Sequence, residues 1–203
     1  MRGPVPLALV CSCLALLAPA GAVAQRATPA AGPVVPDPSE CRVEPRPAAL
    51  LRGTPAATGP VLVDLLRATP VPAADLPAGR PAAGDAAAGI EVTVREAIAC
   101  VNAGDRDRLF ALFSDDFPPA GLYTLGVYDL YAFDPPVSPL PADDRVALPP
   151  IAEARILADG RVGAFLGEST ADPAVFLFFV RSDDGNRWLI DAVVAVGDAT
   201  ATP

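Results

Sequence analysis

A carboxylate inside an apolar strand is the residue of this sequence best placed to do chemistry. Asp191 lies in the stretch "RWLIDAVVAV", residues 187–196. Apolar surroundings favour the protonated form of a carboxyl group, so such an Asp could transfer a proton or orient a ligand. Alternatively, Asp191 is structural and is paired with backbone N–H groups or with an arginine such as Arg155 or Arg181. We favour the structural role, because an unpaired buried charge is very costly.

Three tyrosines could assist such a carboxylate. Their hydroxyl groups could donate hydrogen bonds to an oxyanion, although packing with a solvated hydroxyl is the commoner role. They lie in residues 118–148, which the sequence leaves open as either a weak helix or an irregular lid. The candidate pocket that we predict consists of Asp191, Tyr123, Tyr128, Tyr131, Phe178, Trp188 and Arg155.

The composition excludes several classes of site. The sequence has no His and no Lys, so it offers no imidazole base, no histidine ligand and no Schiff-base lysine. It also lacks a cysteine cluster and a phosphate-binding loop, and we therefore predict no metal and no cofactor. Residues 183–186, "DDGN", look like part of a calcium loop but lack its other ligands, so they predict a turn. A net charge of −9 argues against binding to nucleic acid or anionic lipid.

The N-terminus has the pattern of a secretory signal. Arg2 precedes an apolar run over residues 6–18, and small residues at Ala22 and Ala24 predict cleavage between Ala24 and Gln25. The alternatives are an uncleaved anchor or a lipid-modified cysteine. Cleavage predicts a secreted or extracytoplasmic protein with no membrane span, because the apolar run is short for a bilayer.

Cleavage would leave two cysteines, Cys41 and Cys100. In an oxidising compartment, two remaining cysteines predict one disulfide. The alternative is two free thiols.

Composition divides the rest of the chain. Residues 25–89 are rich in Pro, Ala and Gly and predict an arm that is partly ordered around 41–67, because proline lacks a backbone donor and limits regular pairing. Residues 90–198 predict one domain, and 199–203 a tail. Thr93 and Glu96 have capping-box spacing at the start of a helix. Gly104 would end this helix and Asp105 would begin a second one.

Four antiparallel strands are predicted within residues 151–196. Asp159-Gly160 favours a tight turn between the first two strands. Strict alternation puts Arg155 on the face of Val162 and Ala164, and it puts Asp191 on the face of Phe176 and Phe178. Both faces of the second hairpin are apolar, so both require cover. The helices can cover one face, and the arm, a second subunit or a ligand must cover the other.

Residues 90–196 resemble the nuclear transport factor 2-like superfamily, which includes SnoaL-like and ketosteroid-isomerase-like proteins. The resemblance rests on "VREAIACVNAGDRDRLFALFSDDF", on the hairpin "ILADGRVGAFLGE" and on the last strand, "RWLIDAVVAV". It implies an α+β fold with N-terminal helices packed on a curved, cone-like antiparallel sheet, a pocket in the cone, and dimerisation through the sheet. Enzymes of the superfamily place Asp, Tyr or His in the cone, and His-dependent members are no template for this chain.

These observations lead us to expect an exported, non-catalytic module that binds a small apolar ligand in the cone, forms a homodimer through its sheet, or does both. One alternative is a cofactor-independent isomerase, dehydratase or hydrolase that uses Asp and Tyr. Another is an envelope interaction domain tethered by the Pro-rich arm.

Overall fold

The computed structural model describes residues 32–46, 70–117, 138–167 and 174–197. The chain separates into two compact units, Met1–Gly32 and Pro33–Pro203, and every described helix and strand lies in the second. The helical elements are η1 (Pro38–Glu40), η3 (Ala73–Asp75), α2 (Asp85–Ala103), α3 (Arg106–Phe110) and η4 (Ala142–Asp144). The strands are β1 (Gly79–Pro81), β2 (Ile151–Leu157), β3 (Val162–Leu166), β4 (Ala174–Arg181) and β5 (Trp188–Val196). Within the described ranges, no helix has the length and apolar character needed to cross a membrane.

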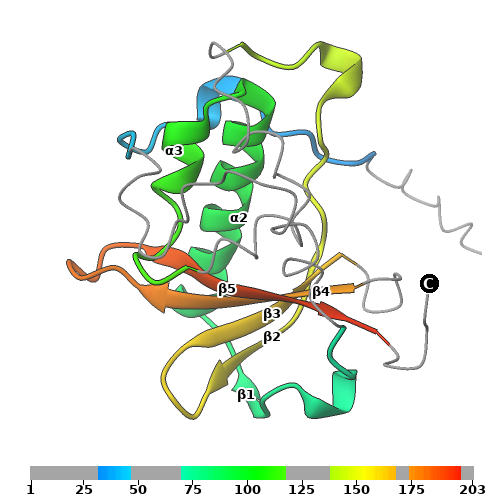
Figure 1. The fold of residues 1–203 in the computed structure, drawn as a ribbon, viewed down its shortest axis with the longest axis vertical. Coiled ribbons are helices and arrows are strands. Elements are labelled where there is room, and N and C mark those ends of the chain that lie inside the picture. The colour runs from blue at the N-terminus through cyan, green and yellow to red at the C-terminus, as the bar shows by residue number, and fades with distance from the viewer. Residues whose placement is uncertain (1–31, 47–69, 118–137, 168–173, 198–203) are drawn as a thin grey trace, which may run out of the picture. The chain divides into compact units, whose positions relative to one another are not determined.

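The strands form one open antiparallel sheet in the order β1-β2-β3-β4-β5 (Figure 1). The predicted α+β class is confirmed, but the sheet has five strands where about four were expected. The additional strand, β1, comes from the Pro-rich arm and pairs Gly79 with Leu157. A Cβ at Gly79 would lie 2.5 Å from the carbonyl oxygen of Ile156, so glycine allows this close approach. A three-residue edge strand that ends in proline has too little periodicity to be recognised in a sequence.

Helix α2 begins at Asp85, well before the capping box expected at Thr93 and Glu96. That expectation was wrong, because Thr93 lies inside the helix and its hydroxyl donates to the carbonyl oxygens of Gly89 and Trp188. The end of the helix is as predicted, with Gly104 in the left-handed conformation at φ 64°. The predicted cap of the second helix is also confirmed, since the Asp105 side chain accepts from the backbone N–H of Arg108.

Two irregularities in strand pairing change which face each side chain occupies. In β2 the register shifts between Ala152 and Arg155, and Glu153 has a φ of 50°. In β5 the residue opposite Phe178 is Ala192 and the residue opposite Phe179 is Ile190, so Asp191 is the extra residue of a bulge. One extra residue reverses the alternation that follows it.

The two faces of the sheet pack against different parts of the chain. The face toward α2 and α3 buries Val162, Ala164, Leu177, Phe179, Ile190 and Val193. The outer face buries Leu157, Phe165, Phe176, Phe178 and Val196. Strict alternation from Asp191 would put Val193 on the face of Phe176 and Phe178 and Val194 on the opposite face, and the bulge exchanges the two. Arg155 is likewise on the outer face, over the rings of Phe165 and Phe176, and not beside Val162 and Ala164 as predicted.

Residues 70–81 form a strap along the outer face, and η3 and β1 lie on the side of the sheet away from the helices (Figure 1). Val71 bridges to Val196 at one edge of the sheet, Leu76 packs in the outer apolar cluster, and Gly79–Pro81 pairs with β2 at the other edge. The arm thus covers part of the second apolar face. The sequence had left open whether the arm, a second subunit or a ligand would do so.

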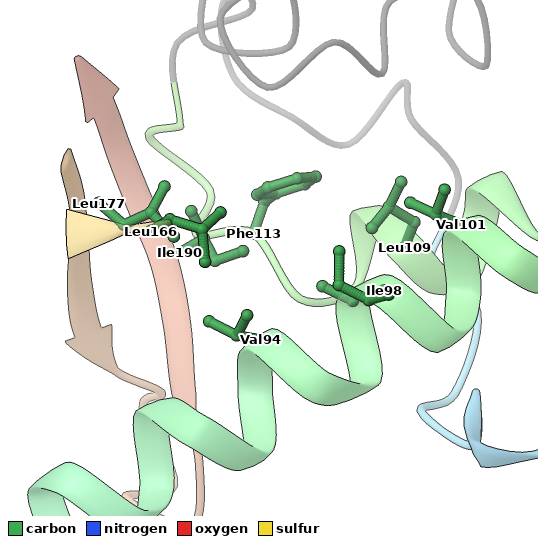
Figure 2. Close-up of a pocket in the computed structure, with 9 residues that line it drawn as sticks. Val94, Ile98, Val101, Leu109, Phe113, Leu166, Leu177 and Ile190 are labelled. Atoms are coloured by element: carbon green, nitrogen blue, oxygen red, sulfur yellow. The ribbon is translucent and has the colours of Figure 1, made fainter. Parts of the chain in front are cut away.

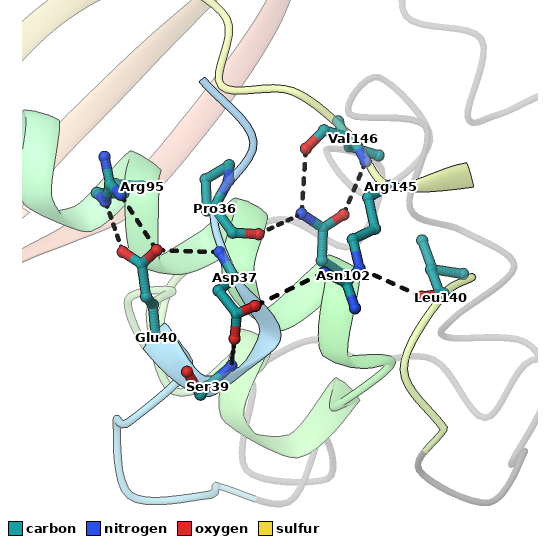
Figure 3. Close-up of polar contacts among 9 residues, drawn as sticks. All are labelled: Pro36, Asp37, Ser39, Glu40, Arg95, Asn102, Leu140, Arg145 and Val146. Carbon is teal, nitrogen blue, oxygen red and sulfur yellow. Dashed lines mark hydrogen bonds and ion pairs between the residues drawn. The ribbon is translucent and has the colours of Figure 1, made fainter. Parts of the chain in front are cut away.

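The N-terminal segment 33–46 is fastened to the helices. The predicted disulfide is confirmed, since Cys41 is bonded to Cys100 of α2. The buried side chain of Asn102 donates to the carbonyl oxygens of Pro36 and Val146 and accepts from the backbone N–H of Val146 (Figure 3). Arg95 pairs with Glu40 in the same region. These contacts tie two segments that are distant in the sequence, 33–46 and the stretch at Val146, to the C-terminal half of α2.

Candidate functional site

Asp191 lies at the bulge of β5 with both carboxylate oxygens engaged. Oδ1 accepts a hydrogen bond from Ser114 Oγ at 2.8 Å, and Oδ2 accepts one from Arg161 Nη1 at 3.1 Å. The Asp191 side chain is only 19% exposed. This is the structural arrangement that we favoured, but the partners are Arg161 and Ser114, whereas Arg155 and Arg181 were expected.

Arg161 reaches Asp191 from the turn between β2 and β3. Its Cζ lies 4.7 Å from the ring centroid of Phe178, and its Nε donates to Asp159 at 2.8 Å. Partial burial acts to lower the pKa of Arg161, but the hydrogen bonds to Asp159 and Asp191 outweigh this effect and raise the pKa above its ordinary value. The Arg161 cation is therefore permanent, and it donates to Asp191 and Asp159 together.

Ser114 is brought to Asp191 by an extension of the sheet edge. After α3, Leu112 O accepts from Ile190 N at 2.8 Å, and Ser114 N donates to Ile190 O at 2.8 Å. Phe113 forms a parallel bridge with Ile190. Sequence reasoning missed both Ser114 and Arg161, since each lies far from Asp191 in the chain and no local pattern marks them.

The other residues of the predicted pocket do not converge. Arg155 and Phe178 lie on the outer face of the sheet, whereas Trp188 is buried on the helix side beside Gly89. Tyr123, Tyr128 and Tyr131 lie outside the described residues. The described members of the predicted set therefore form no common site, because Ile156 pairs with Val162 and this register puts Arg155 on the outer face, while Trp188 faces the helices.

An apolar cavity of about 70 Å³ lies between the helices and the sheet (Figure 2). Its walls come from α2, from α3 and the segment after it, and from the inner faces of β3, β4 and β5. The residues that line it are Val94, Ala97, Ile98, Val101, Leu109, Phe113, Leu166, Leu177 and Ile190.

The local sequence explains the walls of this cavity. Val94, Ala97, Ile98 and Val101 follow the i, i+3, i+4, i+7 spacing of one helix face. Ala97 is the smallest side chain in this row and leaves space opposite the sheet. Helical periodicity predicted this apolar face and the stripe that includes Leu109. It could not predict a cavity, which depends on how closely two elements approach each other.

The lining restricts the chemistry of the cavity. None of its described lining residues has a polar side chain, and Asp191 is not among them. A cavity of this kind can hold an apolar group, but its walls supply no acid, base or nucleophile. Among the described residues, no group of His, Cys, Asp and Glu is arranged to hold a metal ion.

Comparisons of this chain with protein-family models, with curated proteins and with solved structures found no match. The resemblance to nuclear transport factor 2-like proteins therefore rests on the sequence pattern alone, and it stays a prediction together with the cone that it implies.

Proposed function

We propose that this protein is a non-catalytic module that binds a small apolar group in the cavity between α2, α3 and the sheet. The observation that supports the proposal is the wholly apolar lining of that cavity. Such a lining favours ligands through burial of hydrocarbon surface, because it has no hydrogen bond to offer a polar ligand.

The size of the cavity restricts the ligand. Its volume of about 70 Å³ is smaller than the roughly 150 Å³ of an engineered apolar cavity that takes up benzene. The cavity therefore suits a short alkyl chain or the end of a longer one. Each buried methylene group would contribute about 0.8 kcal/mol of binding free energy.

The contacts of Asp191 argue for binding over catalysis. Ser114 and Arg161 occupy its two oxygens, and the residue does not line the described cavity.

The strap argues against self-association through the outer face of the sheet, because Leu76 and β1 already pack where a second copy would dock. A homodimer would have to form through the part of the outer sheet face that the strap leaves uncovered. We therefore propose ligand binding and not self-association.

The Cys41–Cys100 disulfide supports a location outside the cytoplasm.

The test is a titration with 1-hexanol, followed through the methyl NMR signals of the protein. We expect saturable shifts of the signals from Val94, Ile98 and Leu166, which line the cavity. Ala97→Leu adds three carbons inside the cavity and should abolish these shifts. Ala88→Leu makes the same change at an exposed position of α2 and serves as the matched control. Equal saturation of both variants, or the lack of any saturable shift in the unaltered protein, would overturn the proposal.

A further inference from the structure

A second, larger hollow lies where α2 meets the turn between β4 and β5. Its volume is about 210 Å³, and its lining is mixed where that of the first cavity is apolar. Val92 of α2 and Leu112 contribute apolar surface, and Val92 is 63% exposed. Trp188 and the polar side chains of Arg181, Asn186 and Arg187 come from the hairpin. An apolar wall beside two guanidinium groups is suited to an amphipathic ligand with a negative charge.

The guanidinium groups of Arg181 and Arg187 have N–H donors that make no hydrogen bond to the described part of the chain. Arg181 lies with Cζ 4.4 Å from the Trp188 ring centroid, and its Nη1 donates to the carbonyl oxygen of Gly185. The exposed side chain of Arg187 makes no hydrogen bond or ion pair within the described part of the chain, beyond electrostatic attraction to Asp184. A guanidinium has five N–H donors in a planar fork that matches a carboxylate.

Among the described lining residues, Glu96 is the one carboxylate, and one of its two oxygens is engaged. Glu96 Oε1 accepts from the backbone N–H groups of Arg42 at 3.0 Å and Val43 at 2.7 Å. Glu96 thus ties the N-terminal segment to α2, and these contacts hold its side chain in place. Its charge stays in the lining, so Glu96, Arg181 and Arg187 together give the hollow one net positive charge.

Trp188 adds an independent observation. Its indole Nε1 is buried and has no hydrogen-bond partner, although a buried Trp N–H usually has one. Nε1 lies beside Gly89, and both residues line the hollow: a Cβ at Gly89 would be 2.7 Å from it. Nε1 is closed off from solvent, so a ligand oxygen would reach this donor only where the ring edge moved away from Gly89.

We infer that this hollow is a binding site for a small organic carboxylate with an apolar body. The carboxylate pairs with Arg187 and Arg181, and the apolar body packs on Val92, Leu112 and the Trp188 ring. This site is separate from the apolar cavity, since the two share none of their described lining residues.

The experiment uses 3-phenylpropionate as the probe. Trp188 is the single tryptophan of the protein, so its fluorescence reports on this site, while calorimetry measures the dissociation constant. We expect binding with a change in Trp188 emission. Arg187→Gln should raise the dissociation constant by about tenfold or more, because a charge-assisted pair is lost. This substitution leaves the backbone contacts of Arg187 to Ser182 in place.

Three comparisons complete the test. Val92→Glu places a negative charge on the exposed apolar wall and should abolish binding. Arg80→Gln removes a charge from an exposed residue of β1 and should leave the affinity unchanged. The neutral 3-phenylpropanamide should bind at least about tenfold more weakly than the acid. The inference is wrong if the probe does not bind, if the amide binds as tightly as the acid, or if Arg187→Gln and Val92→Glu both retain full affinity. None of these results bears on 1-hexanol in the apolar cavity, so the two proposals can fail separately.

Discussion

Arg161 and Asp191 are joined by a 3.1 Å ion pair although they lie 30 residues apart in the chain. The pair links the turn after β2 to the bulge of β5, and the Arg161 side chain lies over Phe178 between them. An acidic residue within an apolar strand is thereby neutralised by a cation that rests on an aromatic ring. The pair explains how β5 tolerates a carboxylate at the position where its alternation breaks.

Asp191→Asn should lower the free energy of unfolding by about 1 kcal/mol, because the amide keeps the shape but loses the charge that pairs with Arg161. Urea denaturation measures this loss. Asp159→Asn removes the exposed partner of the same arginine and should have the smaller effect. The affinity for 1-hexanol should not change. If Asp191→Asn abolished hexanol binding while the protein stayed folded, Asp191 would belong to the ligand site after all.

Asn102→Ala should be more damaging, with a loss of about 2–4 kcal/mol. The substitution would leave one buried backbone group, the carbonyl of Pro36, and two partly buried groups of Val146 without their partners. Asp143→Ala, at an exposed residue of η4, is the control and should have only a small effect. Thermal unfolding of both variants would check the difference. A loss below that of the control would show that the Asn102 contacts do not stabilise the fold.

Removal of the disulfide, with both Cys41 and Cys100 changed to Ala, should destabilise the protein by roughly 4 kcal/mol. The estimate follows from the entropy of a loop that spans 59 residues. The amides of 33–46 should lose protection first, because the segment would then be held only by contacts such as those of Asn102, Glu40 and Glu96. Hydrogen exchange measures this order. Loss of protection in β4 and β5 before the N-terminal segment would contradict it.

The turn between β4 and β5 should respond to acid. Hydrogen bonds from the Ser182 hydroxyl, then from the backbone and side chain of Asn186, lower the pKa of Asp184 from 3.8 to about 2. A lowered pKa means that the stabilisation is fully present above 3.8 and is lost as the pH falls toward about 2. Melting temperatures between about pH 5 and about pH 2 should therefore fall less steeply for Asp184→Asn than for the unaltered protein. Asp183→Asn is the neighbouring control and should keep the original slope.

Gly89→Ala tests the contact between α2 and Trp188. In an open helix this change would stabilise by about 1 kcal/mol. Here the new Cβ would overlap the indole ring, so we expect a loss of stability and a shift in Trp188 emission. Ala88→Gly, one residue earlier and exposed, should cause only the ordinary propensity loss. A stabilised Gly89→Ala protein would show that the ring can move aside.

Local patterns predicted much of the fold. The strands of the two hairpins, the Gly104 stop, the Asp105 cap and the two-cysteine pairing all depend on residues close together or on simple counting. The start of α2 was missed because Thr93 and Glu96 have capping-box spacing inside a longer helix. The run of Ala and Gly before them hides the first turns, since alanine favours a helix but gives no apolar face.

The candidate site was harder to predict. Alternation from a two-residue Asp159-Gly160 turn placed Arg155 on the face of Val162 and Ala164. In the structure Leu157 N donates to Arg161 O, so the loop is one residue longer, Ile156 pairs with Val162, and Arg155 falls on the outer face. Alternation also identified Asp191 as unusual, but it could not find Ser114 or Arg161. Both hollows were missed for the same reason: their walls come from segments that approach each other only in the folded chain.

The sequence alone determined the α+β class, the antiparallel hairpins, the acidic charge, the lack of His and Lys, and the Cys41–Cys100 pair. These features depend on composition and on the helix and strand periods, which act over a few residues. Only the tertiary structure decided the strap across the outer face, the two bulges, the partners of Asp191 and the two hollows. Those features result from packing between distant segments, where one extra residue in a strand or one glycine at a contact decides which side chains meet.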